Sequence, residues 1–244
     1  NEVIECAIQS LGLNDLSSFD PQKKIIEYAI SDKRNKLVNL SVQDLLDEIS
    51  TKSPAPGGGS VSALLGSNAA SLCSMVASLT YYKKDFFNLR EKMNDFGKRA
   101  QLIKDELIVL IDEDTRAFNA ILEANKLPAK DDKEIKIKEE AIKNANELAF
   151  ETPYHIASLC AEVLSLCVDL SKDGNPSSIS DVGVAAESAY AGFKGATMNV
   201  LINMPNIENN DFRNKISNEL KTKKSDVEAS YKATINEISR VLNT

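Results

Sequence analysis

Apolar positions along this chain recur every three or four residues, the spacing of one face of an α-helix. This spacing, with the start and stop residues around it, predicts helices joined by short loops. No segment shows the alternation of β-branched residues that a half-buried strand requires, so we expect almost no sheet. The expected helices lie at about 2–11, 21–28, 41–50, 60–80 and 86–125, then in a segment ending at 150, and at 153–170, 180–204 and 209–242.

Individual residues set several of the expected helix ends. Ser60 is a natural N-cap for the helix at 60–80. Pro153 is expected to begin a helix, because proline suits the first turn and disrupts the interior. With short loops between helices, the pattern predicts an all-α protein, a bundle of about seven to nine helices.

Composition supports the helical prediction and excludes some functions. The chain has 244 residues, enough to bury a core without disulfides or a metal. A net charge of −7 disfavours nucleic-acid binding. The four cysteines form no C-x-x-C pair, which indicates reduced, buried thiols in a cytoplasmic protein without zinc. The single histidine, His155, excludes a multi-histidine site, so we expect no metal.

An uncharged stretch, residues 61–82, is long enough to span a bilayer. It contains several serines, together with asparagine and threonine, which make a lone membrane span unfavourable. We therefore expect a central helix packed on all sides by protein, and no membrane association. The chain start also lacks the basic and apolar segments of a signal peptide.

The segment just before this stretch reads Pro-Ala-Pro-Gly-Gly-Gly-Ser at 54–60. Gly57, Gly58 and Gly59 carry a large entropic cost, which indicates a close backbone approach or an unusual conformation. A glycine-rich loop leading into a helix presents N–H groups to an anionic or carbonyl-bearing ligand. A tight interhelical turn explains the same residues, and the segment alone leaves both interpretations open.

Two further helices carry polar groups on faces that should be packed. The helix at 180–204 has a stripe of small and polar residues, which indicates either close helix packing or the wall of a polar pocket. That stripe consists of Asp181, Ala185, Ser188, Gly192, Gly195, Asn199 and Asn203. On the helix at 86–125, Asp114 falls on the apolar stripe, as either a structural or a pKa-tuned catalytic carboxylate. Asp112 faces away from that stripe and is the weaker candidate.

Lys83 and Lys84 follow the uncharged helix directly. The helix dipole favours lysines at a C-terminus without any function. In an acidic protein they could also bind the carboxylates of a ligand's tail.

Taken together, these segments resemble the cyclodeaminase/cyclohydrolase family of folate enzymes. The resemblance covers about residues 38–243 and is concentrated in residues 53–63, 75–80, 112–118, 127–128, 174–186, 195–196 and 199–203. Residues 7–13, 19–21 and 25–28 resemble the end of a formiminotransferase where it joins a cyclodeaminase. We therefore expect residues 1–37 to be a transferase tail and linker, and residues 38–244 a cyclodeaminase domain. The rest of a fused transferase domain, with its activity, should be missing from this chain.

The resemblance implies a formimidoyltetrahydrofolate cyclodeaminase, which converts 5-formimidoyltetrahydrofolate to 5,10-methenyltetrahydrofolate and ammonia. It also implies a homodimer with the folate site near the dimer interface, and no cofactor beyond the tetrahydrofolate substrate. Methenyltetrahydrofolate cyclohydrolase is the alternative within the family. An inactive helical scaffold that only dimerises is the alternative outside it.

The family chemistry also gives the candidate site residues their expected roles. Asp181 and Asp114 would form the acid/base or amidinium-stabilising pair, with Asp112 as a further candidate. Lys83 and Lys84 would hold a polyglutamate tail. The remaining substrate-binding candidates act through backbone or amide groups: Gly57, Gly58, Gly59, Ser60, Asn175, Ser180, Asn199 and Asn203.

Overall fold

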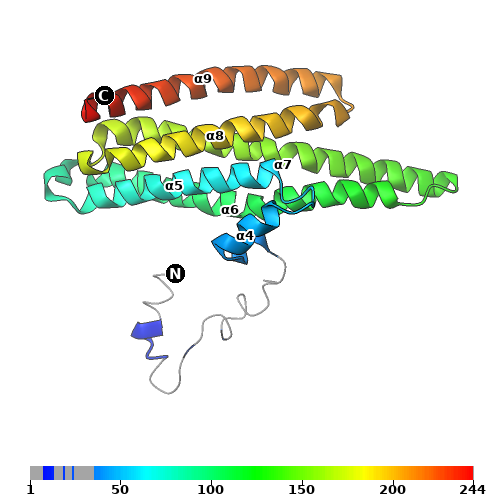
Figure 1. Ribbon diagram of the computed structural model, residues 1–244, viewed down its shortest axis with the longest axis horizontal. Coiled ribbons are helices and arrows are strands. Elements are labelled where there is room, and N and C mark those ends of the chain that lie inside the picture. Colours follow the sequence, from blue (N-terminus) through cyan, green and yellow to red (C-terminus); the bar gives the residue numbers. More distant parts are fainter. Residues whose placement is uncertain (1–7, 14–18, 20–23, 25–35, 244) are drawn as a thin grey trace. The chain divides into compact units, whose positions relative to one another are not determined.

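The computed structural model of the chain, drawn in Figure 1, describes residues 8–13, 19, 24 and 36–243. The chain divides into two compact parts, residues 1–39 and 40–244. In the first part, residues 8–10 are helical and Gly12 has a φ of 62°, so the predicted helix end at Gly12 is confirmed. This part also holds the 3-10 helix η1 (Leu37–Asn39). Apart from Lys24, the helix predicted at 21–28 lies outside the described residues.

The second part is helical throughout. Its α-helices are α4 (Val42–Ile49), α5 (Gly58–Tyr82), α6 (Arg90–Lys126), α7 (Asp132–Asp173), α8 (Ile179–Asn203) and α9 (Asn210–Leu242). Short 3-10 helices connect some of them: η2 (Lys84–Leu89), η3 (Pro176–Ser178) and η4 (Met204–Asn206). The described residues contain no strand, and the all-α prediction is confirmed.

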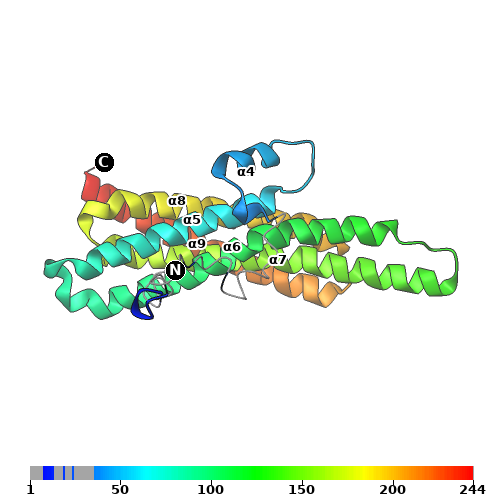
Figure 2. The same cartoon turned by 90° about the horizontal axis from the view of Figure 1, so that it is seen from below.

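Successive long helices run in opposite directions, and α9 packs against α7 and α8 (Figures 1 and 2). Side-chain contacts fix the directions: Ser60 near the start of α5 meets Asp114 late in α6, whereas Ser74 near the end of α5 meets Gln101 early in α6. The hairpin formed by the end of α6 and the start of α7 extends past the ends of α5 and α8 in both views.

Close packing between α5 and α8 depends on glycine. A Cβ at Gly192 would lie 2.9 Å from the carbonyl oxygen of Ser62, and one at Gly195 would overlap the Ser62 hydroxyl. The middle of the small-residue stripe on α8 is therefore a helix-packing surface. Two helices, α5 and α7, are long and apolar enough to cross a membrane, but 61% and 56% of their most apolar windows are buried in the bundle. Core packing accounts for that apolar character.

Three predicted helix boundaries are wrong. The helix expected at 86–125 begins at Arg90, because residues 84–89 form η2. Ser60 is the third residue of α5, and Gly57 holds the N-cap position. Pro153 does not begin a helix but lies inside α7, which runs without a break for 42 residues. The charged run at 130–143 and the apolar segment after Pro153 therefore belong to one element.

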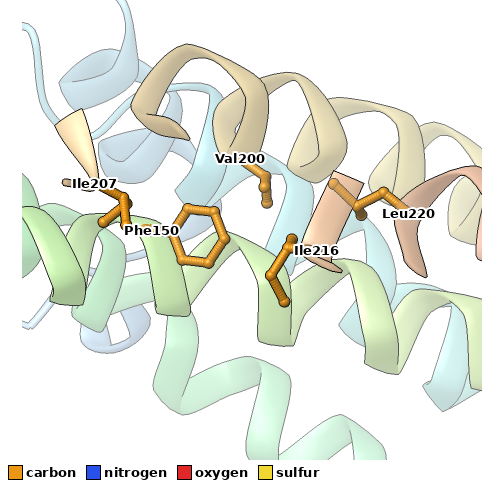
Figure 3. Packing of buried hydrophobic residues seen from close by; sticks show 5 residues of the cluster. All are labelled: Phe150, Val200, Ile207, Ile216 and Leu220. Atoms are coloured by element: carbon orange, nitrogen blue, oxygen red, sulfur yellow. The ribbon is translucent and has the colours of Figure 1, made fainter. Parts of the chain in front are cut away.

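A cluster of buried side chains joins α7, α8 and α9 near Pro153 (Figure 3). Phe150 comes from α7, Val200 from α8, and Ile216 and Leu220 from α9, while Ile207 follows η4. These side chains are at most 8% exposed. The cluster holds the C-terminal end of α8 against the middle of α7.

Candidate active site

The first turn of α5 is capped by a carboxylate from another helix. Gly57, at the N-cap, has no side chain that could accept a hydrogen bond. Asp114 of α6 supplies the acceptor instead: its Oδ2 accepts from the backbone N–H of Ser60 at 2.8 Å. A negative charge at a helix N-terminus also interacts favourably with the helix dipole. The sequence thus places Asp114 on a packed face, and α5 gives it a polar partner there.

The Ser60 hydroxyl makes three contacts with α6. Its Oγ lies 3.0 Å from Asp114 Oδ2, 2.9 Å from the Ile111 carbonyl oxygen and 3.2 Å from Thr115 Oγ1. A Cβ at Gly59 would overlap the Asp114 carboxylate, so only glycine leaves room for this approach. Gly59 is therefore explained by close contact with the carboxylate.

Two opposing effects act on the Asp114 carboxyl. Burial raises its pKa above the ordinary 3.8, because a low-dielectric environment disfavours the charged form. The hydrogen bonds from the Ser60 hydroxyl and N–H lower the pKa, and burial is the larger effect. A carboxyl group with a raised pKa can hold and release a proton nearer to neutral pH.

Asp114 opens onto a cavity of about 260 Å³ at this end of the bundle. The first backbone N–H bonded within the helix pattern is that of Val61, to the Gly57 carbonyl, so the N–H groups of Gly58 and Gly59 have no intrahelical acceptor. The wall contains both polar and apolar groups. The lining includes Gly57, Gly58, Gly59, Asp114, Phe118, Ile121, Ala149, Asn199, Ile202 and Asn203.

Both candidate asparagines of α8 lie at this cavity, and each uses its amide to donate to a backbone carbonyl. Asn199 donates to Gly195 at 2.9 Å and lies close to Gly58. Asn203 donates to Ala149 of α7 at 2.7 Å. The structure therefore brings together Asp114, the three glycines, Ser60 and both asparagines, as one site requires.

Five of the other candidates lie at the opposite end of this helix pair, around the end of α5 and the start of α8. Lys83 Nζ donates to Asn175 Oδ1 at 3.0 Å, and the Asn175 N–H donates to Thr80 Oγ1 at 2.9 Å. Ser180 and Asp181 are in the first turn of α8, where the helix dipole favours the Asp181 carboxylate. Lys84 is exposed at the start of η2.

The two groups are far apart within one chain. Asp181 and Asn199 are separated by 18 residues of α8, or about 27 Å along the helix axis, at 1.5 Å per residue. Lys83 lies about 37 Å from Gly58 along α5 on the same basis. The expected pairing of Asp181 with Asp114 therefore does not occur within one chain, because Asp181 lies at the start of α8 and Asp114 lies beside its other end. Asp112 is about 200° around α6 from Asp114 and does not line the cavity.

The described cysteines and the histidine do not line this cavity. Cys73, Cys160 and Cys167 are buried free thiols, as predicted, while Cys6 lies outside the described residues. His155 is a surface group beside Glu106, 3.4 Å away. Among the residues that the structure describes, no three histidine, cysteine or acidic side chains gather as a metal site would require.

Sequence reasoning missed two contributors to the site. Thr115 has no distinctive sequence signal, but its hydroxyl contacts the Ser60 hydroxyl. The Ala149 carbonyl carries no sequence signal of its own. The residue that could have revealed it is Pro153, four residues later, because a proline within a helix leaves the Ala149 carbonyl without its usual donor.

The fold and the cavity define a helical-bundle protein in which a partly buried carboxylate and a glycine-rich helix start line one cavity. The chain belongs to the formiminotransferase-cyclodeaminase family: the model of that description matches residues 41–222. A second model, the formiminotransferase domain, matches residues 1–31. Both matches agree with the resemblance in the sequence.

Known proteins similar to this chain carry two different activities in their names. Formimidoyltransferase-cyclodeaminase of Mus musculus is 34% identical over 87% of this chain, which spans only 40% of that relative's length. Methenyltetrahydrofolate cyclohydrolase of Methylorubrum extorquens is 32% identical over 75% of this chain and 88% of its own. The crystal structure of formiminotetrahydrofolate cyclodeaminase from Thermotoga maritima superposes with a TM-score of 0.75 at 26% identity, over 83% of this chain and 98% of that one.

Proposed function

We propose that this chain is a formimidoyltetrahydrofolate cyclodeaminase. The single observation that carries the proposal is the partly buried carboxyl of Asp114, held at the start of α5 inside a cavity formed by family-matching segments. In the reaction, N10 of the folate attacks the carbon of the protonated formimino group, the amidinium N5–CH=NH₂⁺, and forms a new C–N bond. The N10 proton is transferred to the amino group, whose bond to carbon then breaks, releasing ammonia and the 5,10-methenyl product.

Asp114 is proposed to move that proton. A carboxylate can accept the proton from N10 and, once protonated, donate it to the departing amine. The raised pKa brings both states within reach during one turnover. The carboxylate also stabilises the positive charge of the formimino carbon. Asn199 would present its Oδ1 to the N–H groups of the substrate, because its Nδ2 is already bonded to Gly195.

The glycine-rich turn is proposed to hold the pterin. The N–H groups of Gly58 and Gly59 can donate to a carbonyl oxygen, and Phe118, Ile121 and Ile202 offer apolar surface to a flat ring. About 260 Å³ is below the usual range of about 300–1,000 Å³ for cavities that enclose drug-sized ligands. The cavity would therefore hold only the reacting end of the substrate.

The rest of the substrate, with any polyglutamate tail, would extend beyond this cavity. We propose that the chain forms a homodimer, since the group containing Lys83, Lys84, Asn175, Ser180 and Asp181 lies too far away to act on the same ligand within one chain. A second chain could bring that group to the cavity. We further propose a cytoplasmic enzyme that needs no cofactor beyond tetrahydrofolate, fused to a formiminotransferase domain in the full-length protein.

The second candidate is methenyltetrahydrofolate cyclohydrolase. The observation that favours it is the Methylorubrum extorquens relative, because the match covers 88% of that protein. The same cavity could hold the methenyl compound while Asp114 activates a water molecule. A non-catalytic scaffold is the third candidate, which would leave the pocket carboxylate without a chemical purpose.

One assay separates the three candidates. The purified chain is mixed with 5-formimidoyltetrahydrofolate, and appearance of the methenyl product is followed by absorbance. In parallel, loss of the methenyl compound is followed without the formimino substrate. Product formation that disappears in Asp114→Asn but persists in Asp105→Asn, an exposed carboxylate on the same helix, supports the proposal. Methenyl hydrolysis alone favours the cyclohydrolase, and neither activity, with no folate binding by calorimetry, favours the scaffold.

A further inference from the structure

Pro153 leaves one carbonyl of α7 without its normal donor. Proline has no backbone N–H, so residue 153 cannot donate to the carbonyl of Ala149, four residues earlier. Ala149 is only 6% exposed, and a buried carbonyl requires a partner. The Asn203 side chain is that partner: its Nδ2 donates to the Ala149 oxygen at 2.7 Å.

This hydrogen bond joins two residues of the cavity wall, one from α7 and one from α8. Ala149 and Asn203 both line the same cavity as Asp114. On the side away from the cavity, Phe150 follows Ala149, and Val200 lies one turn before Asn203, within the core cluster of Figure 3. The core cluster holds the two helices together by apolar contact, and the Asn203 amide is the directional contact between them.

We infer that Asn203 is a positioning residue, which fixes the α7 wall of the cavity by replacing the hydrogen bond that Pro153 removes. This role differs from the direct substrate contact that the sequence predicted for Asn203. Without the amide, the Ala149 carbonyl would be buried and unsatisfied, and the turn at residues 149–153 would move relative to Asp114. The inference rests on the proposed function for its kinetic consequence only.

The pairing of proline and asparagine gives a direct test by a double-mutant cycle. Asn203→Leu removes the donor, whereas Pro153→Ala restores a backbone N–H at 153 that can reach the Ala149 carbonyl. We measure urea unfolding and steady-state kinetics of formimidoyltetrahydrofolate conversion for the wild type, both single variants and the double variant. Asn203→Asp, which keeps the shape but removes the donor, repeats the comparison if the leucine variant does not fold.

Asn203→Leu should lower the unfolding midpoint clearly in the Pro153 background and much less in the Pro153→Ala background, because the two residues are coupled. The KM should rise about tenfold in the first background and less than about threefold in the second, with kcat changing little in either. Asn206→Leu, at an exposed position three residues later, is the control and should change neither quantity.

Three results would decide the inference. Equal losses of stability in both backgrounds would overturn it. A KM increase of the same factor in both backgrounds would also overturn it, since a ligand contact by Asn203 does not depend on Pro153. Coupled unfolding midpoints in a chain without any folate activity would support the Asn203–Ala149 link and reject the proposed function instead.

Discussion

Asp114 of α6 and Ser60 of α5 form a two-part contact, in which both the backbone N–H and the hydroxyl of Ser60 approach the same carboxylate oxygen. The contact serves the fold, because it caps a helix whose own N-cap is glycine. It also orients a carboxyl group of raised pKa toward a cavity. One interaction thus links the stability of the bundle to the proposed chemistry.

Replacing the Asp114 carboxylate should remove activity. Asp114→Asn keeps an acceptor for the Ser60 N–H but cannot move a proton. We expect turnover of formimidoyltetrahydrofolate to fall by about 10²- to 10⁴-fold, the usual contribution of a positioned acid or base. Steady-state rates of methenyl formation measure the effect, with Asp105→Asn as the matched control. A variant with more than half of wild-type turnover would exclude Asp114 from proton transfer.

The same variant should lack one part of the wild type's dependence of stability on pH. Because the folded-state pKa of Asp114 is raised, the carboxyl contributes to stability below its ordinary pKa of 3.8, and that contribution is lost as the pH rises through the folded-state value. Asp114→Asn therefore gains stability relative to the wild type as the pH rises from below 3.8 through the folded-state pKa of Asp114. Urea unfolding at several pH values measures this difference. A relative loss with rising pH would show that the hydrogen bonds from Ser60 outweigh burial.

Gly59 should tolerate no side chain. In Gly59→Ala the new Cβ overlaps the Asp114 carboxylate, which its bonds to Ser60 hold in place. We expect a loss of about 1–3 kcal/mol in the free energy of unfolding, as for overpacked cores, together with a loss of activity. Chemical denaturation and the methenyl assay measure the two effects.

Gly97, inside α6, provides the matched control for that substitution. A Cβ there would meet only the Ala77 Cβ at 3.8 Å, an ordinary contact. Gly97→Ala should therefore stabilise the chain by roughly 0.5–1 kcal/mol, because alanine loses less backbone entropy in a helix. If both alanine variants gained stability, the Asp114 carboxylate would have to occupy another position in solution.

The sequence predicts helix positions well in this protein because apolar spacing and stop residues agree. The predicted helices at 41–50, 60–80, 180–204 and 209–242 end within two residues of α4, α5, α8 and α9. The helix start predicted at Pro153 is wrong because a distant residue partly offsets the cost of a proline inside a helix: Asn203, fifty residues later, donates to the free Ala149 carbonyl. No local rule contains that information.

Most residues of the candidate site could be recognised from the sequence, but their arrangement in space could not be predicted from it. Glycine runs, a carboxylate on an apolar stripe and asparagines on a packed stripe each mark unusual positions. Whether Asp114 meets Asp181 or Ser60 depends on helix direction and register, which the spacing within each helix does not encode. The structure places Asp114 with Ser60 and leaves Asp181 at the other end of α8.

The three described cysteines should be unreactive until the bundle unfolds. Cys73, Cys160 and Cys167 are each at most 1% exposed. Burial raises the pKa of Cys160 to about 12, and the hydrogen bond with Cys73, followed by burial, raises the pKa of Cys167. At pH 8 a thiol with a pKa of about 12 is ionised in only about one molecule in ten thousand, and the thiolate is the reactive form.

A Cys6→Ser variant isolates these three thiols, which are titrated with a chromogenic disulfide reagent. We expect no reaction in the native chain over an hour and three equivalents after unfolding in guanidinium. The Sγ atoms of Cys73 and Cys167 are 3.5 Å apart, well beyond the bonded distance of about 2.05 Å, so unfolding without a reductant should still release all three. Prompt reaction of any thiol in the native chain would mean that α5 and α7 separate readily, and the core described above would not be intact in solution.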